Sequence, residues 1–262
     1  MDLAIRTKSI VRAMVIAVLL LTLAGLAARF ALYVLGDGPL LRPLSLFDVG
    51  AERNIPTWFE SMQFMLCSVL LAVVAVSHRQ RGERFSKHWG VLSVILLYMS
   101  LDEVATIHET MGAELQRLLH YLTGFTPGGA ISYFWVVPGA LFVLVVGLSY
   151  IGFLVHLPRD TRLRFLFAAA VFLLGAIGFE MLTAEVVSSS GAIANWVATS
   201  FGGSIERGTA DAIPTILKGG QTSIEEMLEM LGLTAFVWAL LAHISSYVDE
   251  DITVGVYTGK SG

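Results

Sequence analysis

The chain has 262 residues, of which 55% are hydrophobic and only 15% are charged, and its formal net charge is −4. Soluble domains carry about 25% charged residues, so this composition indicates a membrane protein. The slightly acidic balance and the lack of a long basic run argue against a nucleic-acid partner. The single cysteine, Cys67, lies in an apolar run, which excludes an internal disulfide and predicts a packing role.

Six apolar segments are long enough to cross a hydrocarbon core about 30 Å thick, which takes about 20 helical residues. They lie near residues 10–35, 57–77, 89–111, 131–157, 163–188 and 224–248. Because these runs lack the alternation of barrel strands, they predict one domain over residues 1–262, an all-α polytopic transmembrane helix bundle. The first run follows Arg6 and Lys8, but it is longer than a signal-peptide core, which favours an uncleaved first helix. The connections are short except for 36–56 and 189–223.

The basic residues predict the orientation, because short cytoplasmic loops are rich in Lys and Arg. Three clusters fall in alternate connections: Arg6, Lys8 and Arg12; Arg79, Arg81, Arg84 and Lys87; Arg159, Arg162 and Arg164. All three lie on one side if both termini are cytoplasmic. We therefore expect a multipass protein of the bacterial inner membrane, with the lipid bilayer as its first partner.

With this orientation, acidic residues of several helices reach the same depth. At 1.5 Å per residue, Asp102 lies about 20 Å from the inner face, Glu180 about 25 Å and Glu109 about 30 Å. The second and sixth segments begin at the outer face with further acids: Glu60, Glu225, Glu226 and Glu229. Four helices therefore place carboxylates in the outer third of the membrane.

Some of these acids have a structural interpretation. The segments "TWFE" (57–60) and "SIEE" (223–226) match the capping box, in which a Ser or Thr and a Glu satisfy free N–H groups at a helix start. We expect Glu60 and Glu225 to act as caps, whereas Glu226 is equally compatible with a cap or a site. Glu229 lies a turn beyond the cap, which weakens this interpretation.

Three acids, Asp102, Glu103 and Glu180, lie well inside apolar helices. A carboxylate there costs a few kcal/mol and usually faces a bundle interior, a partner or a pathway. The alternative is burial as a protonated acid hydrogen-bonded to its neighbours. Arg29 is the obvious positive partner, and it can neutralise only one acid.

The segment "SLDEVATIHE" (100–109) carries three carboxylates and a histidine. On an ideal helix Asp102 and Glu109 share a face, while Glu103 and His108 flank that face on opposite sides. All four cannot bind one ion unless the helix is distorted, so we expect a subset with Asp102 and Glu109 to face inward. His108 is a metal ligand, a proton carrier or an interfacial histidine.

The segments "FDVGAERNIPTWFE", "SLDEVATIHE" and "SIEEMLEMLG" resemble a pattern of uncharacterised multipass bacterial membrane proteins, with the motifs DExxxxHE and EExxExLG. The resemblance covers most of the chain. It implies a six-helix inner-membrane protein and no particular activity.

Carboxylates crowded at low dielectric either protonate or bind cations. The sequence therefore predicts a periplasm-facing site for a divalent metal ion, formed by Asp102, Glu103, His108, Glu109, Glu180, Glu226 and Glu229. Such a site fits a metal-dependent enzyme acting on a lipid-soluble substrate, although the Glu-x-x-His spacing of di-iron bundles is absent.

Two alternatives remain open. A proton- or cation-coupled transporter would use intramembrane acids, with weak candidate helix breaks at Pro138–Gly139 and Gly175–Gly178. An accessory subunit of a larger complex would dock a membrane-protein partner through the glycine-rich segment 189–223, which is long for a structureless loop.

Overall fold

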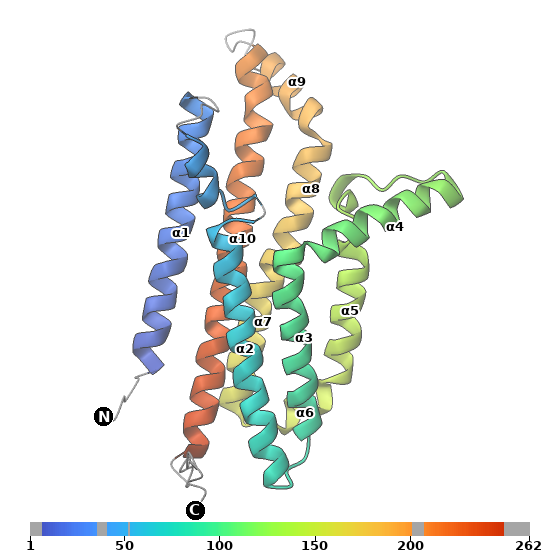
Figure 1. Ribbon diagram of the computed structural model, residues 1–262. Helices are drawn as coiled ribbons and strands as arrows, with labels where there is room; N and C mark the ends of the chain where they lie inside the picture. Colours follow the sequence, from blue (N-terminus) through green and yellow to red (C-terminus); the bar gives the residue numbers. More distant parts are fainter. Residues whose placement is uncertain (1–6, 36–40, 52, 201–206, 249–262) are drawn as a thin grey trace, which may run out of the picture.

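The computed structural model describes residues 7–35, 41–51, 53–200 and 207–248, and within these ranges the chain forms helices and turns without any strand. Figure 1 shows long helices running side by side in an elongated bundle, with a shorter helix projecting sideways from it. Arg6, which we assigned to the first basic cluster, lies outside the described residues.

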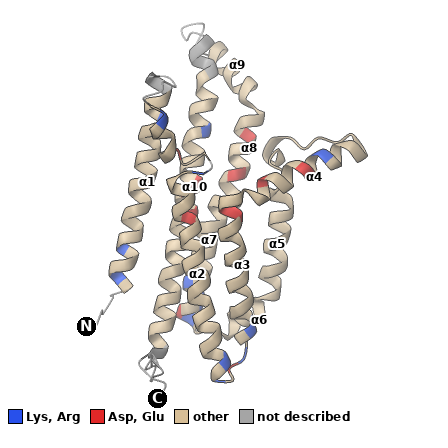
Figure 2. Cartoon of the chain, viewed as in Figure 1, with Lys and Arg blue, Asp and Glu red and all other residues tan. Residues whose placement is uncertain are grey.

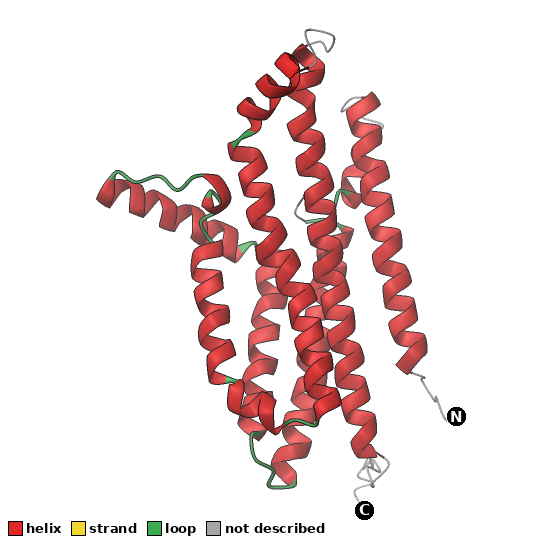
Figure 3. Cartoon of the chain, turned by 180° about the vertical axis from the view of Figure 1, so that it is seen from behind, coloured by secondary structure: helices red, strands yellow, loops and turns green. Residues whose placement is uncertain are grey.

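The bundle is built from α1 (Thr7–Leu35), α2 (Ile55–Gln80), α3 (Ser86–Ala105), α5 (Val136–Ser149), α6 (Ile151–His156), α7 (Arg159–Leu173), α8 (Glu180–Ser188) and α10 (Arg207–Val248). A π-helical turn, η3 (Leu174–Phe179), joins α7 to α8. The remaining elements are η1 (Arg42–Phe47), α4 (Ile107–Thr123), η2 (Gly129–Ile131) and α9 (Ser190–Ser200). The all-helical prediction is confirmed for the described part of the chain (Figure 3).

Five helical stretches in the described residues are long and apolar enough to cross a membrane, which indicates a multipass membrane protein. They are Thr7–Leu32, Ile55–Gln80, Ser86–Ala105, Arg159–Ser188 and Ala212–Ser246. The segment 131–157, expected as a sixth span, is divided among η2, α5 and α6, and α5 by itself has only 14 residues.

Two predicted boundaries are wrong. The third span ends at Ala105 rather than near 111, because Thr106 adopts a left-handed conformation with φ of 50° and the chain turns into α4. Segment 189–223, expected as a loop, is helical over 190–200 and from 207 onward, while 201–206 lie outside the described residues. Its glycines did not prevent helix formation, since Gly219 and Gly220 lie inside α10.

The capping roles assigned to Glu60 and Glu225 are also wrong. Asn54 caps α2, and its side-chain oxygen accepts a hydrogen bond from the backbone N–H of Thr57 at 2.9 Å. Ser223 lies in the interior of α10, where its hydroxyl donates to the Gly219 carbonyl at 2.8 Å. Glu60 therefore lies in the second turn of α2 and Glu225 in the interior of α10, and both are buried in the bundle.

Small polar residues join α2 to α3. The hydroxyl of Ser61 donates to the carbonyl of Ser100 at 2.8 Å, and Ser100 donates back to Ser61 at 2.9 Å. Ser68 and Ser93 repeat this reciprocal pair two turns away. Such interhelical hydrogen bonds replace the hydrophobic driving force that is weak between helices in lipid.

Helix α10 packs closely on both α2 and α7. The amide of Gln63 donates to the hydroxyl of Thr234 at 2.8 Å. A Cβ atom on Gly232 would lie 2.6 Å from the backbone nitrogen of Phe172, so the α7–α10 approach requires glycine. These contacts fix α10 in the bundle, with its row of glutamates facing α2 and α8.

Candidate cation-binding site

The break at Thr106 brings Asp102 and His108 together. The backbone N–H of His108 donates to one Asp102 carboxylate oxygen at 2.8 Å, and Nδ1 of the same histidine lies 2.7 Å from the other. On a continuous helix these residues would be separated by more than a turn and a half. The expectation that Asp102 and Glu109 share one inward helix face is therefore wrong, since the left-handed residue turns α4 away from α3 and leaves Glu109 exposed.

His108 lies just beyond the end of the α3 span, and opposing effects act on its pKa. Burial lowers the pKa of the ring, but the hydrogen bond and negative charge of Asp102, with smaller contributions from Glu109 and Glu103, raise it above its ordinary value overall. The Trp135 ring packs edge-on against the imidazole, with centroids 4.6 Å apart. The pairing of Asp102 with Nδ1 directs Nε2 toward other partners, which is how carboxylate–histidine pairs orient an imidazole.

Glu60 is the most buried carboxyl group of the acidic layer among the described residues. It is only 1% exposed and is hydrogen-bonded to Glu229 of α10, with Glu103 and Glu226 close enough to act on it electrostatically. Two carboxyl groups form a hydrogen bond only when one of them retains a proton. The second Glu60 oxygen, Oε1, is buried without a hydrogen-bond partner. A fully buried carboxyl with an unsatisfied oxygen is costly unless a proton donor or cation reaches it.

A second carboxyl pair links α8 to α10. Glu225 is 7% exposed and hydrogen-bonded to Glu180, and the hydroxyl of Thr183 donates to Oε2 of Glu225 at 3.3 Å. The indole N–H of Trp135 donates to Glu180 at 3.0 Å. The four side chains thus form one hydrogen-bonded chain across α8, α10 and the segment before α5.

The π-helical turn η3 immediately precedes Glu180. Such turns insert one extra residue into a helix and recur at functional sites. Gly175 lies in this turn, where an added Cβ would come within 2.8 Å of both the Glu225 carbonyl oxygen and Cγ of Glu229. The turn and its glycine therefore allow α10 to bring its acidic face against the α7–α8 helix at the level of Glu180.

A cavity of about 370 Å³ adjoins these pairs. Four carboxylates contribute to its wall from three helices: Glu109, Glu180, Glu225 and Glu226. Burial, reinforced by Glu180, Glu225 and Glu109, raises the pKa of Tyr133, which also lines the cavity. Lys218 of α10 is the basic residue among the lining side chains. The cavity is therefore polar and predominantly acidic.

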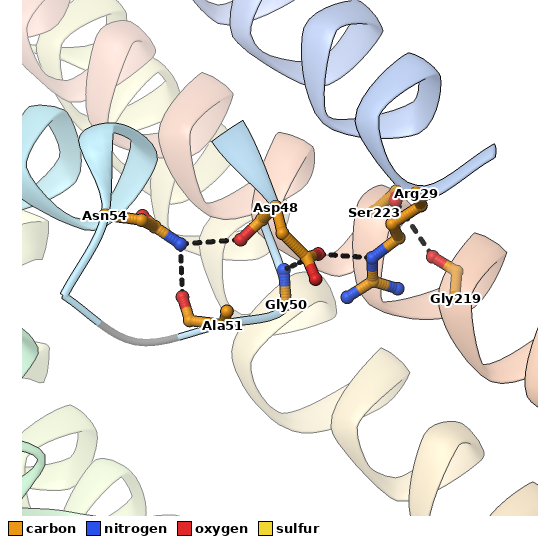
Figure 4. Close-up of polar contacts among 7 residues, drawn as sticks. All are labelled: Arg29, Asp48, Gly50, Ala51, Asn54, Gly219 and Ser223. Atoms are coloured by element: carbon orange, nitrogen blue, oxygen red, sulfur yellow. Dashed lines mark hydrogen bonds and ion pairs between the residues drawn. The ribbon is translucent and has the colours of Figure 1, made fainter. Parts of the chain in front are cut away.

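Arg29, expected to neutralise part of the acidic layer, instead forms an ion pair with Asp48 in the segment before α2. Figure 4 shows its guanidinium beside Gly50 and Gly219, and a Cβ on Gly219 would lie 2.9 Å from one of its nitrogens. Asp48 also accepts from the backbone N–H of Gly50 at 3.2 Å. Because Arg29 pairs with Asp48, it does not supply the acidic layer with the positive charge that the sequence suggested.

The predicted site residues thus fall into three groups. Glu103, Glu226 and Glu229 surround Glu60. Glu180 pairs with Glu225 beside the cavity, which Glu109 also lines. Asp102 and His108 form a separate pair. Figure 2 shows the acids of α2, α3, α4, α8 and α10 concentrated at one level of the bundle. Within the described residues, no group of three or more His, Cys, Asp or Glu is placed to hold a metal ion.

The sequence pattern placed Glu60 and Glu225 at the level of the acidic layer but left them out of the predicted site, because each stood in a capping motif. It also missed the hydrogen-bonding partners Thr183 and Trp135. The signal that could have identified Glu60 is the Pro-containing start "NIPTW", in which Asn54 is itself a strong N-cap and Pro56 suits the first turn.

Residues 13–244 match a family model described as a domain of unknown function, DUF8692. The match covers most of the chain, and the chain belongs to this family. No curated protein and no solved structure matches it.

Proposed function

We propose that this DUF8692 protein binds a cation, in the first instance a divalent metal ion, in the acidic layer of the bundle. The main support is the environment of Glu60. Its side chain is 1% exposed, one of its carboxyl oxygens has no hydrogen-bond partner, and it lies among Glu103, Glu226 and Glu229. In the present arrangement this oxygen lacks both a hydrogen-bond donor and a positive charge. A cation supplies what the oxygen lacks and offsets the repulsion among its neighbours.

Oxygen-rich coordination suits hard ions such as Mg²⁺, Mn²⁺ and Ca²⁺. The ligands we assign are the carboxylates around Glu60, with entry from the cavity that Glu226 lines. The ion would displace the proton shared by Glu60 and Glu229, so binding releases a proton and strengthens as the pH rises. Side-chain rotations bring the oxygens into ligating positions.

We propose further that the protein lies in the bacterial inner membrane with six spans and both termini in the cytoplasm. Helices α5 and α6 together run from Val136 to His156, which is about 30 Å of helix and matches the hydrocarbon core. The basic residues at the C-terminal end of α2 and at the N-terminal end of α7 lie at the end of the bundle away from the acidic layer (Figure 2). The positive-inside rule then makes the layer face the periplasm.

The test is metal binding by the purified full-length protein in detergent. The protein is stripped with chelator, dialysed against Mn²⁺, Mg²⁺ or Ca²⁺, and analysed for metal content and by calorimetric titration. We expect about one ion per chain, and a loss of binding in Glu60→Gln and Glu226→Gln. Glu114→Gln is the matched control, because Glu114 is exposed on α4 and pairs with Arg117 at 2.5 Å. Absence of binding by any of these ions, or equal binding by all three variants, contradicts the proposal.

A metal-dependent enzyme is the second candidate, and the Asp102–His108 pair favours it. An imidazole held at Nδ1 by a carboxylate presents Nε2 for proton transfer or for a metal. The Trp135 ring that contacts His108 also lines the acidic cavity, so the pair lies beside the cation site. A lipid-soluble substrate would enter from the outer leaflet. A transporter is distinguished by cation flux in liposomes, which we do not expect of the enzyme.

A further inference from the structure

Helix α4 differs from every other long helix in its direction. Figures 1 and 3 show from opposite sides that it projects sideways from the bundle rather than along it. It begins at Ile107, two residues after Ala105, where a helical stretch long and apolar enough to cross a membrane ends. Of its 17 residues, only Gly112 is buried.

One face of α4 is apolar and exposed. Met111, Leu115, Leu118 and Leu122 recur at intervals of four, three and four residues, which places them on one stripe of the helix. Their exposed fractions are 63%, 41%, 52% and 68%. Tyr121 lies in the last turn of α4 and Phe125 two residues beyond its end, and both are exposed. Aromatic side chains of this kind concentrate at membrane–water boundaries.

The opposite face of α4 packs against the rest of the protein. Glu109, Gly112, Ala113 and Gln116 line the acidic cavity, and their spacing of three, one and three residues puts them on a single helix face. An added Cβ on Gly112 would lie 2.7 Å from the Trp135 Cβ, so α4 is held tightly against the segment before α5. This contact fixes which side of α4 faces away from the cavity.

We propose that α4 is an interfacial helix whose apolar stripe lies in the boundary between lipid headgroups and acyl chains, while its opposite face forms a wall of the cavity. Amphipathic helices of low overall hydrophobicity lie in the plane of the membrane in this way. The cavity therefore opens at headgroup level.

Lipid is a better occupant of the stripe than a second copy of the chain. A 17-residue helix is about 25 Å long, so one face about 10 Å wide covers roughly 250 Å². A stable protein interface buries about 800 Å² on each partner. The position of α4 directly after a candidate membrane span also favours the bilayer, as does the exposure of apolar side chains on α3, where Tyr98 and Leu101 are 52% and 59% exposed.

Spin labels on the two faces of α4 test the proposal in the full-length protein reconstituted into phosphatidylcholine vesicles. Leu118→Cys and Leu122→Cys report on the apolar stripe, and Arg117→Cys and His120→Cys report on the polar side. Cys67 is fully buried, so the unsubstituted protein provides the labelling background. Leu20→Cys, at a 62% exposed position of α1, provides the hydrocarbon reference.

Collision rates with oxygen, which partitions into lipid, and with a water-soluble nickel chelate then give the depth of each label. We expect the oxygen-to-nickel ratio at positions 118 and 122 to be severalfold above that at 117 and 120, and below that at position 20. High nickel accessibility at all four positions would overturn the proposal by placing α4 in water. Low accessibility of 118 and 122 to both reagents would overturn it in favour of a protein partner over the stripe.

Discussion

The Asp102 carboxylate binds His108 through two separate atoms, the backbone N–H at 2.8 Å and ring Nδ1 at 2.7 Å. The first contact stabilises the turn from α3 into α4. The second gains strength when the ring is protonated, because the two groups then carry opposite charges. A single carboxylate therefore both shapes the break at Thr106 and controls the histidine beside the cavity.

Asp102→Asn should lower the pKa of His108. A histidine whose pKa is raised on folding stabilises the protein below its unfolded pKa of about 6.5, and this contribution is lost as the pH rises through the folded pKa. The free energy of unfolding of the variant should therefore fall by about 1.5 kcal/mol at low pH, and by less at high pH. This value is at the lower end of the range for charged hydrogen bonds, because the His108 side chain is 32% exposed. NMR titration of the ring and unfolding at several pH values measure both effects.

The asparagine can still accept the backbone N–H of His108, so the turn itself is retained in this variant. His120→Gln is the control, since His120 is exposed on the same helix. An unchanged His108 titration in Asp102→Asn would show that the ring does not depend on this carboxylate.

Glu60→Gln should preserve the stability of the bundle, whereas Glu60→Ala should not. A glutamine amide donates to Glu229 as the protonated carboxyl does, so we expect a change within about 1 kcal/mol. Alanine leaves a cavity and an unpaired Glu229, at a cost of about 2–5 kcal/mol. Denaturant unfolding in mixed micelles compares the two. Equal losses in both variants would mean that the negative charge of Glu60, rather than its hydrogen bond, holds α2 to α10.

Gly232→Ala should destabilise the α7–α10 contact. The new Cβ would lie within 2.8 Å of three Phe172 atoms, two of them backbone, so a helix must shift, at a cost of about 1–3 kcal/mol. Gly220→Ala is the matched control in the same helix, because its Cβ would meet nothing within 4 Å. There we expect a gain of about 0.5–1 kcal/mol from the better helix propensity of alanine. Thermal unfolding of the two variants should therefore shift in opposite directions.

Arg29→Gln should reduce stability without changing cation affinity. Its guanidinium pairs with Asp48, whose side chain is 23% exposed, and removing it leaves a half-buried carboxylate at a cost of about 1–3 kcal/mol. Since Arg29 pairs with Asp48, outside the acidic layer, calorimetric titration with Mn²⁺ should match the native protein. A large gain in affinity would mean that Arg29 competes with the cation for the acidic layer.

The sequence by itself determined the helical class, most of the spans and the level of the acidic layer. The length of an apolar run and the rise per residue depend only on the order of residues along the chain. The spans of α2 and α3 could therefore be placed, and the depth of Asp102 estimated, without knowing which helices pack against them. The basic clusters are likewise a property of the chain alone.

Only the tertiary structure decided which acids meet. The pairing of Glu60 with Glu229 joins residues far apart in the sequence, and a capping motif gave a sufficient local explanation for Glu60. The left-handed Thr106 separates His108 from the α3 face on which an ideal helix would have placed it. Helical periodicity assumes a regular backbone, so it cannot predict a single reversed φ angle. It also cannot predict the rotation of one helix against another, because that rotation is determined by packing with distant parts of the chain.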